Sequence, residues 1–160
     1  MEAQKKQALI KGAVITGVIN AVINGGIQYF LLKDHDVIPI SVDSITNNDQ
    51  TVLGAAVMLA ITLSMILTLV AYFGIKEKKV PFFPDAFWSV IKHGFFTFGV
   101  ITSLAVLWQR YAGTVEVSLL AALIIIGVIA GIVSGVVNYL TLKNCVLPQK
   151  PTAADYSTTN

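Results

Sequence analysis

The chain has 160 residues, a formal net charge of +2, 55% hydrophobic residues and only 12% charged residues. With a mean hydropathy of +0.74, it lies outside the range of soluble globular domains. No cluster of basic residues comes with a folded basic surface, which argues against nucleic-acid binding. The composition therefore predicts an integral membrane protein whose first partner is the lipid bilayer.

Four stretches without Asp, Glu, Lys or Arg are long enough to cross a hydrocarbon core, which needs about 20 helical residues. They lie between Lys11 and Lys33, Asp49 and Lys76, Lys92 and Arg110, and Glu116 and Lys143. We expect an all-α membrane protein, a four-transmembrane-helix bundle with spans at about 8–32, 51–75, 86–112 and 116–142. Residues 1–147 would form one domain, and residues 148–160 a disordered cytoplasmic tail.

The distribution of basic residues predicts the orientation in the membrane. Only Lys33 and Arg110 fall in the loops on the side away from the termini. The segments on the other side hold Lys5, Lys6, Lys11, Lys76, Lys78, Lys79, Lys92, Lys143 and Lys150. Since cytoplasmic loops carry an excess of Lys and Arg, both termini are expected to be cytoplasmic.

The two halves of the chain resemble each other weakly. Ile10-Lys11 aligns with Ile91-Lys92, and the Tyr-x-x-x-Lys pattern that begins at Tyr72 recurs at Tyr139. A duplication would give two parallel helical hairpins, each entering and leaving the membrane on the cytoplasmic side. Chance matching among apolar helices is the competing explanation.

Polar residues recur every fourth position in the first span, as Gly12, Thr16, Asn20, Asn24 and Gln28. This spacing puts them in one slowly winding stripe along the helix. Other polar residues within the spans are Ser64, Thr68, Thr102, Ser103, Ser134 and Asn138. The stripe and these residues either bond across helices or line a path or ligand site for a small solute.

The last span contains a glycine ladder, Gly127-x-x-x-Gly131-x-x-x-Gly135. Glycines at this spacing permit close approach of another helix, so they predict a packing face toward a helix of this chain or of another protomer. His93, at the inner boundary of the third span, is either an ordinary interfacial histidine or a pH sensor, because histidine titrates near neutral pH.

We find no catalytic constellation and no metal motif, and we expect no cofactor and no enzymatic activity. No span carries a carboxylate for proton transfer. The Asp34-His35-Asp36 sequence has a spacing that matches no established metal site. A membrane enzyme is therefore a distant third among the functional hypotheses.

Several runs resemble a group of small, uncharacterised bacterial four-span inner-membrane proteins, some of which carry the loose label "permease". The runs are Ile10-Lys11-Gly12, Ile19-Asn20, Ile23-Asn24-Gly25, Val80-Pro-Phe-Phe-Pro84, Lys92-His-Gly-Phe-Phe-Thr-Phe-Gly99 and Val106-Leu-Trp-Gln-Arg110. The resemblance implies four spans in a bacterial inner membrane. It brings no defined substrate and no functional residue.

These observations favour a small transporter or channel for a small ion or neutral polar solute, with a path lined by the amides of the first span. The alternative is a non-transporting accessory or assembly protein that binds another membrane protein through its polar stripe and glycine ladder. In either case the chain is expected to form a homo-oligomer or to join a larger membrane complex.

Overall fold

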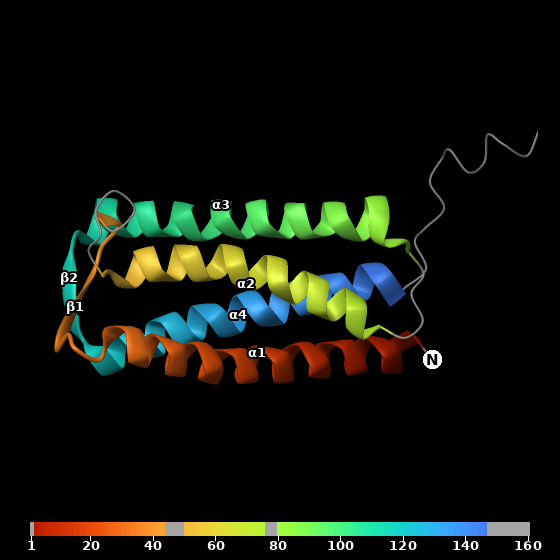
Figure 1. Ribbon diagram of the computed structural model, residues 1–160, viewed down its shortest axis with the longest axis horizontal. Coiled ribbons are helices and arrows are strands. Elements are labelled where there is room, and N and C mark those ends of the chain that lie inside the picture. Colours follow the sequence, from red (N-terminus) through yellow and green to blue (C-terminus); the bar gives the residue numbers. More distant parts are fainter. Residues whose placement is uncertain (1, 44–49, 76–79, 147–160) are drawn as a thin grey trace, which may run out of the picture.

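The computed structural model describes residues 2–43, 50–75 and 80–146. It contains four long helices, α1 (Glu2–Leu32), α2 (Val52–Gly74), α3 (Phe87–Ala112) and α4 (Leu119–Val146), as Figure 1 shows. A short π-helical turn, η2 (Phe82–Ala86), precedes α3, and two short strands, β1 (Val37–Ile40) and β2 (Val115–Ser118), lie in the loops. The expected tail, 148–160, lies outside the described residues.

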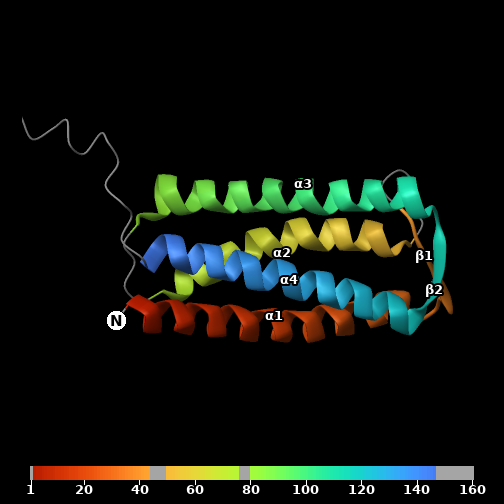
Figure 2. The same ribbon diagram turned by 180° about the vertical axis from the view of Figure 1, so that it is seen from behind.

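Four helical segments are long and apolar enough to cross a bilayer, and they are Lys6–Leu32, Val52–Gly74, Phe82–Ala112, which joins η2 to α3, and Leu119–Asn144. The helices form because these stretches lack charges and, unlike the soluble amphipathic pattern, are apolar around most of their circumference. The expectation of a multi-pass, helical membrane protein is thus met. The described part of α1 begins and that of α4 ends at the same end of the molecule (Figures 1 and 2). Which side of the membrane this end faces stays a prediction.

The helices pack in the spatial order α1, α4, α2, α3. Helix α4 lies between α1 and α2, and α2 lies between α4 and α3 (Figures 1 and 2). Among the described residues, α1 and α2 hardly touch, and α3 and α4 touch only slightly. The expected pair of helical hairpins is therefore not how the chain packs, because consecutive helices α1 and α2 are separated by α4.

The two loops at the end of the molecule opposite the N-terminus join as a small antiparallel sheet. Its register pairs Val37 with Ser118 and Pro39 with Glu116. Pro39 is tolerated because each strand of a two-stranded sheet is an edge strand. This pairing corrects the expected start of the fourth span near residue 116: residues 115–118 are extended, and α4 begins at Leu119.

The sheet is held against the helices by a hydrophobic cluster at this end. Ile38 and Ile40 of β1 are buried together with Leu32 at the end of α1 and with Val52 at the start of α2. The cluster also includes Ile126 of α4. One face of β1 therefore covers the ends of three helices.

A second cluster forms the contact between the two central helices. Ala60 and Leu67 of α2 and Val133 and Val137 of α4 are buried there. Because α2 and α4 each have neighbours on both sides, they carry most of the core, while α1 and α3 expose long apolar faces. Such faces suit contact with lipid chains.

Introducing cysteines at the paired positions Val37→Cys and Ser118→Cys, in a Cys145→Ser background, should give a disulfide on mild oxidation. These Cα partners lie directly opposite each other in the sheet, and disulfides require Cα atoms within about 7 Å. Non-reducing electrophoresis of intact membranes reads out the cross-link. Val37→Cys with Val115→Cys, which is displaced along the same strand, is the matched control, and equal cross-linking of both pairs would contradict the register.

Candidate functional site

The contact between α1 and α4 is made by small residues on both helices, and we call it the seam. Gly17 faces Gly131 so closely that a Cβ atom on Gly17 would lie 2.8 Å from the carbonyl oxygen of Gly131. A Cβ on Gly127 would lie 3.2 Å from the Ala21 oxygen, and one on Gly135 3.2 Å from the Ala13 oxygen. The glycine ladder of α4 therefore packs on α1 of the same chain.

The half of the seam on α1 was not singled out from the sequence. Ala13, Gly17 and Ala21 repeat every four residues, as the glycines of α4 do. This small-x-x-x-small spacing was the signal that could have identified it. It lies one residue out of phase with the polar stripe, which is the more conspicuous pattern in the same helix.

Beside the seam, α1 carries three amides that we call the amide row: Asn20, Asn24 and Gln28. The Nδ2 of Asn20 donates to the Thr16 carbonyl oxygen at 2.9 Å, and the Nδ2 of Asn24 donates to the Asn20 carbonyl oxygen at 2.8 Å. Asn20 and Asn24 are half-buried, and Gln28 is buried with 8% of its surface exposed. The first two amides thus bond back to their own helix.

The side-chain oxygen atoms of the amide row have no hydrogen-bond donor among the described residues. Among the described residues, the Oδ1 atoms of Asn20 and Asn24 accept no hydrogen bond, and the Gln28 amide makes none. In hydrocarbon an amide oxygen without a donor costs free energy, because no water is present to replace the missing bond. The half-buried Asn20 and Asn24 therefore offer acceptors to a group that lies outside this chain or to water, whereas Gln28 is covered by the chain itself.

One hydrogen bond crosses the seam. The Nδ2 of Asn138 on α4 donates to the Oγ1 of Thr16 on α1 at 3.0 Å. The Oδ1 of Asn138 is buried and has no partner within the described residues. Thr16 and Asn138 are thus brought together as the stripe suggested, and the Asn138 oxygen adds a fourth unpaired acceptor to this region.

The other polar residues of the spans do not join the amide row. The hydroxyl of Ser64 donates to the Ile61 oxygen at 2.9 Å, and that of Ser134 donates to the Ala130 oxygen at 2.6 Å. Ser103 is exposed on α3, and Thr102 has a buried Oγ1 without a partner among the described residues. Among the described residues these side chains therefore form no hydrogen bond with the amide row, because most of their hydroxyls bond within their own helices.

A separate polar contact joins α2 and α3. The Oγ1 of Thr68 lies 2.9 Å from Nδ1 of His93 and 2.7 Å from the Ser64 carbonyl oxygen. A hydroxyl has one proton, and the carbonyl can only accept. Thr68 therefore donates to the Ser64 carbonyl oxygen, and the protonated Nδ1 of His93 donates a hydrogen bond to the Oγ1 of Thr68. His93 faces the neighbouring helix instead of standing alone at the interface.

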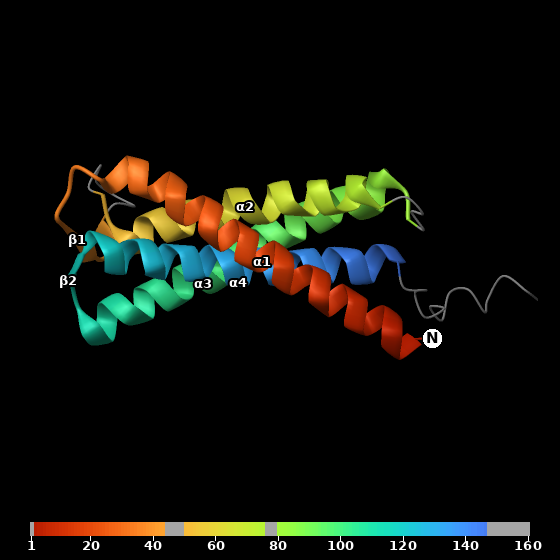
Figure 3. The ribbon, with the colours of Figure 1, turned by 90° about the horizontal axis from the view of Figure 1, so that it is seen from below.

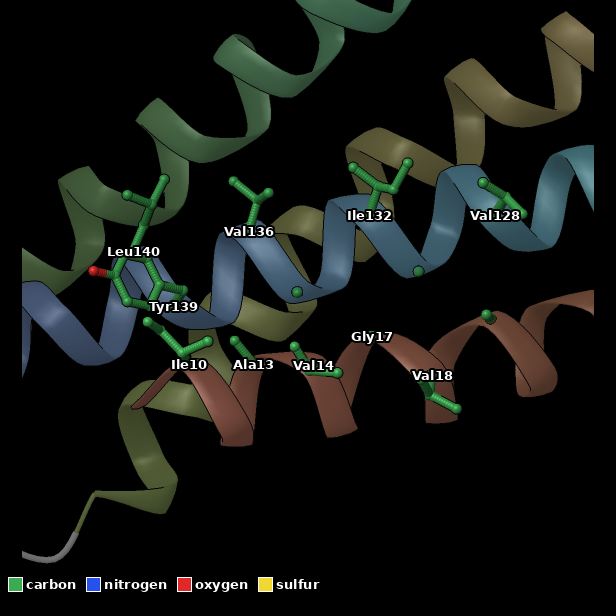
Figure 4. A pocket seen from close by; sticks show the side chains of 13 residues that line it. Ile10, Ala13, Val14, Gly17, Val18, Val128, Ile132, Val136, Tyr139 and Leu140 are labelled. Atoms are coloured by element: carbon green, nitrogen blue, oxygen red, sulfur yellow. The ribbon is translucent and has the colours of Figure 1, made fainter. Parts of the chain in front are cut away.

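An open groove of about 620 Å³ runs along the seam between α1 and α4 (Figure 4). Its lining residues are Ile10, Ala13, Val14, Gly17, Val18, Ala21, Val128, Gly131, Ile132, Gly135, Val136, Tyr139 and Leu140. On a helical wheel at 100° per residue, Val14 and Val18 lie on one side of Gly17, and Thr16 and Asn20 lie on the other. The groove is thus apolar and runs along the side of the seam away from the amide row.

The described residues hold no group of three His, Cys, Asp or Glu side chains that could bind a metal ion. Asp34, His35 and Asp36 are all exposed, directly after α1. Comparison of the chain with protein-family models, with curated proteins and with solved structures finds no match in any of the three. The function of this chain therefore has to be inferred from the seam, the amide row and the groove.

The substitution Gly17→Leu should lower the stability of the folded protein by about 1–3 kcal/mol, because the added side chain meets the Gly131 backbone. Thermal unfolding in mild detergent would measure the loss. Gly26→Leu is the matched control, since a Cβ there meets nothing within 4 Å. Equal melting temperatures for the two variants would contradict the seam.

The tautomer of His93 can be tested by NMR. We expect the ¹⁵N shifts of selectively labelled protein at neutral pH to show Nδ1 protonated and Nε2 unprotonated. In Thr68→Val this preference should weaken, because the acceptor at Nδ1 is removed. His35, which is exposed, serves as the internal reference, and an Nε2-protonated His93 in the wild type would contradict the assignment.

Proposed function

We propose that this chain is a membrane-embedded accessory or assembly protein, which binds another membrane protein or a second copy of itself through the amide row. The observation that carries the proposal is that the Oδ1 atoms of Asn20 and Asn24 have no donor among the described residues. They lie on α1, whose described contacts with the other long helices are almost all with α4. Its partner would be a membrane helix carrying donor side chains such as Ser, Thr, Asn or Gln.

The energetics of membrane helices support this role. Packing between helices in lipid gains little from the hydrophobic effect, so small residues and polar side chains supply much of the association. In this chain the small residues are used within the molecule, at the seam. The Oδ1 atoms of Asn20 and Asn24, which are half-buried, have no donor among the described residues and remain for contact with a partner.

The cellular setting is also part of the proposal. Nine lysines fall in the sequence segments expected on the same side of the membrane as the termini, and this excess favours cytoplasmic termini. The resemblance to small bacterial inner-membrane proteins favours that membrane. Both features suit a small subunit held in the bilayer beside a larger one.

Transport of a small ion or neutral polar solute is the second candidate, and the unpaired Oδ1 of Asn138 favours it. A buried oxygen of this kind often bonds an ordered water, and it lies beside Thr16, close to the amide row. The large groove at this seam is apolar. A polar path along the row would therefore need a second chain to close it.

Replacing two members of the row, in Asn20→Leu with Asn24→Leu, should weaken association about tenfold. Each interhelical amide bond contributes roughly 0.6–1 kcal/mol in a membrane, and 1.4 kcal/mol corresponds to about a factor of ten. Energy transfer between differently labelled copies, together with cross-linking to other membrane proteins, would measure it. Thr62→Leu is the control, because Thr62 is exposed and bonds only within α2, and unchanged association in the double variant would refute the proposal.

Solvent access to the row separates the two candidate functions. With Cys145→Ser and Asn20→Cys, the assembly role predicts little labelling by a small membrane-impermeant thiol reagent from either side. Strong labelling, with Ile19→Cys unlabelled as the control, would mean that water reaches this depth. That result would favour transport.

A further inference from the structure

The apolar groove between α1 and α4 has the form of an open wedge. Seen from below, α1 crosses α4 obliquely (Figure 3), so the two helices enclose an open wedge at one side of the seam. Val14 and Val18 of α1 and Ile132 and Val136 of α4 border this wedge (Figure 4). All four side chains are largely exposed in the isolated chain.

The groove has the length of one bilayer leaflet. On α4 it runs from Val128 to Leu140, which is about 18 Å at 1.5 Å per residue. On α1 it runs from Ile10 to Ala21, which is about 17 Å by the same rise. Half of a hydrocarbon core is about 15 Å. The groove therefore matches the depth of a single acyl chain.

Two lysines lie at the end of the groove nearest the start of α1, one from each helix. Lys11 lies three and seven residues before Val14 and Val18, so it shares their face of α1. Lys143 lies four and seven residues after Tyr139 and Val136, so it shares their face of α4. Both lysines are exposed. One end of the apolar groove thus lies beside two positive charges.

We propose that this groove binds one phospholipid with an anionic headgroup, with an acyl chain between α1 and α4 and the phosphate between Lys11 and Lys143. The lining offers no hydrogen-bond partner apart from Tyr139 at the charged end, which suits a hydrocarbon chain. Basic side chains that lie at the depth of the lipid headgroups attract anionic lipids. The bound lipid would fill the wedge and stabilise the crossing of α1 and α4, whatever partner the amide row binds.

The charge part of the proposal is tested with Lys11→Gln and Lys143→Gln combined. The protein is reconstituted in vesicles of phosphatidylethanolamine and phosphatidylglycerol, and native mass spectrometry measures the lipid that stays bound. Each lysine near an anionic headgroup is worth about a fivefold preference, so the double variant should lose roughly 25-fold of the preference for phosphatidylglycerol. Lys92→Gln, toward the same end of the molecule but on α3, should keep it, and an equal loss in that control would overturn the site.

The acyl-chain part is tested by filling the groove with Val18→Phe and Ile132→Phe. This variant should retain at least tenfold less phosphatidylglycerol than Ile19→Phe, an exposed residue of α1 outside the groove. Retention that is unchanged in the filled variant would overturn the proposal. Efficient cross-linking between two copies through Val18→Cys would also overturn it, because a second chain would then occupy the groove.

Discussion

Close approach of α1 and α4 is the contact on which the remaining architecture depends. The backbones meet because glycine and alanine face each other along the seam, and at Gly17 a Cβ would lie 2.8 Å from the Gly131 carbonyl oxygen, so a larger residue would have to displace the backbone there. In a bilayer the hydrophobic effect does not drive helices together, so such contact has to come from packing and hydrogen bonds. The seam supplies packing along its length and one hydrogen bond, from Asn138 to Thr16.

Placing α1 against α4 fixes the arrangement of the other elements. Helix α2 is separated from α1 and packs instead between α4 and α3. The loops that follow α1 and α3 are thereby brought together and pair as β1 and β2. On one side of the seam the oblique crossing leaves an apolar groove. The amide row lies on the other side, with oxygen atoms that the rest of the described chain does not satisfy.

The sequence predicted the four spans well, because the absence of charges over a membrane's thickness is a strong signal. It could not predict which helices are neighbours, since all four are apolar around most of their surface and short loops allow several arrangements. The repeat pattern at Tyr72 and Tyr139 suggested hairpins. The small residues Ala13 and Gly17 instead allow α1 to pack on α4. The strands were missed because each has only four residues and forms solely by pairing with the other.

The candidate site was predicted in part. The four-residue spacing placed Thr16, Asn20 and Asn24 along one line of α1, and Asn138 does meet Thr16. Ser64 and Ser134 were expected to bond across helices or to line a path together with the stripe, but their hydroxyls bond the preceding turn of their own helices. Spacing reveals which residues share a face, whereas the choice between an internal and an interhelical bond depends on the distance to the next helix.

The spatial order of the helices can be measured in a bilayer. Spin labels on exposed positions of α1 (Val22), α4 (Val128) and α2 (Met58) can be compared pairwise by pulsed electron paramagnetic resonance in reconstituted protein. We expect the label on α1 to be nearer to the label on α4 than to that on α2. We also expect Gly17→Leu to lengthen the distance from α1 to α4. A distance from α1 to α2 as short as that from α1 to α4, unchanged by Gly17→Leu, would contradict it.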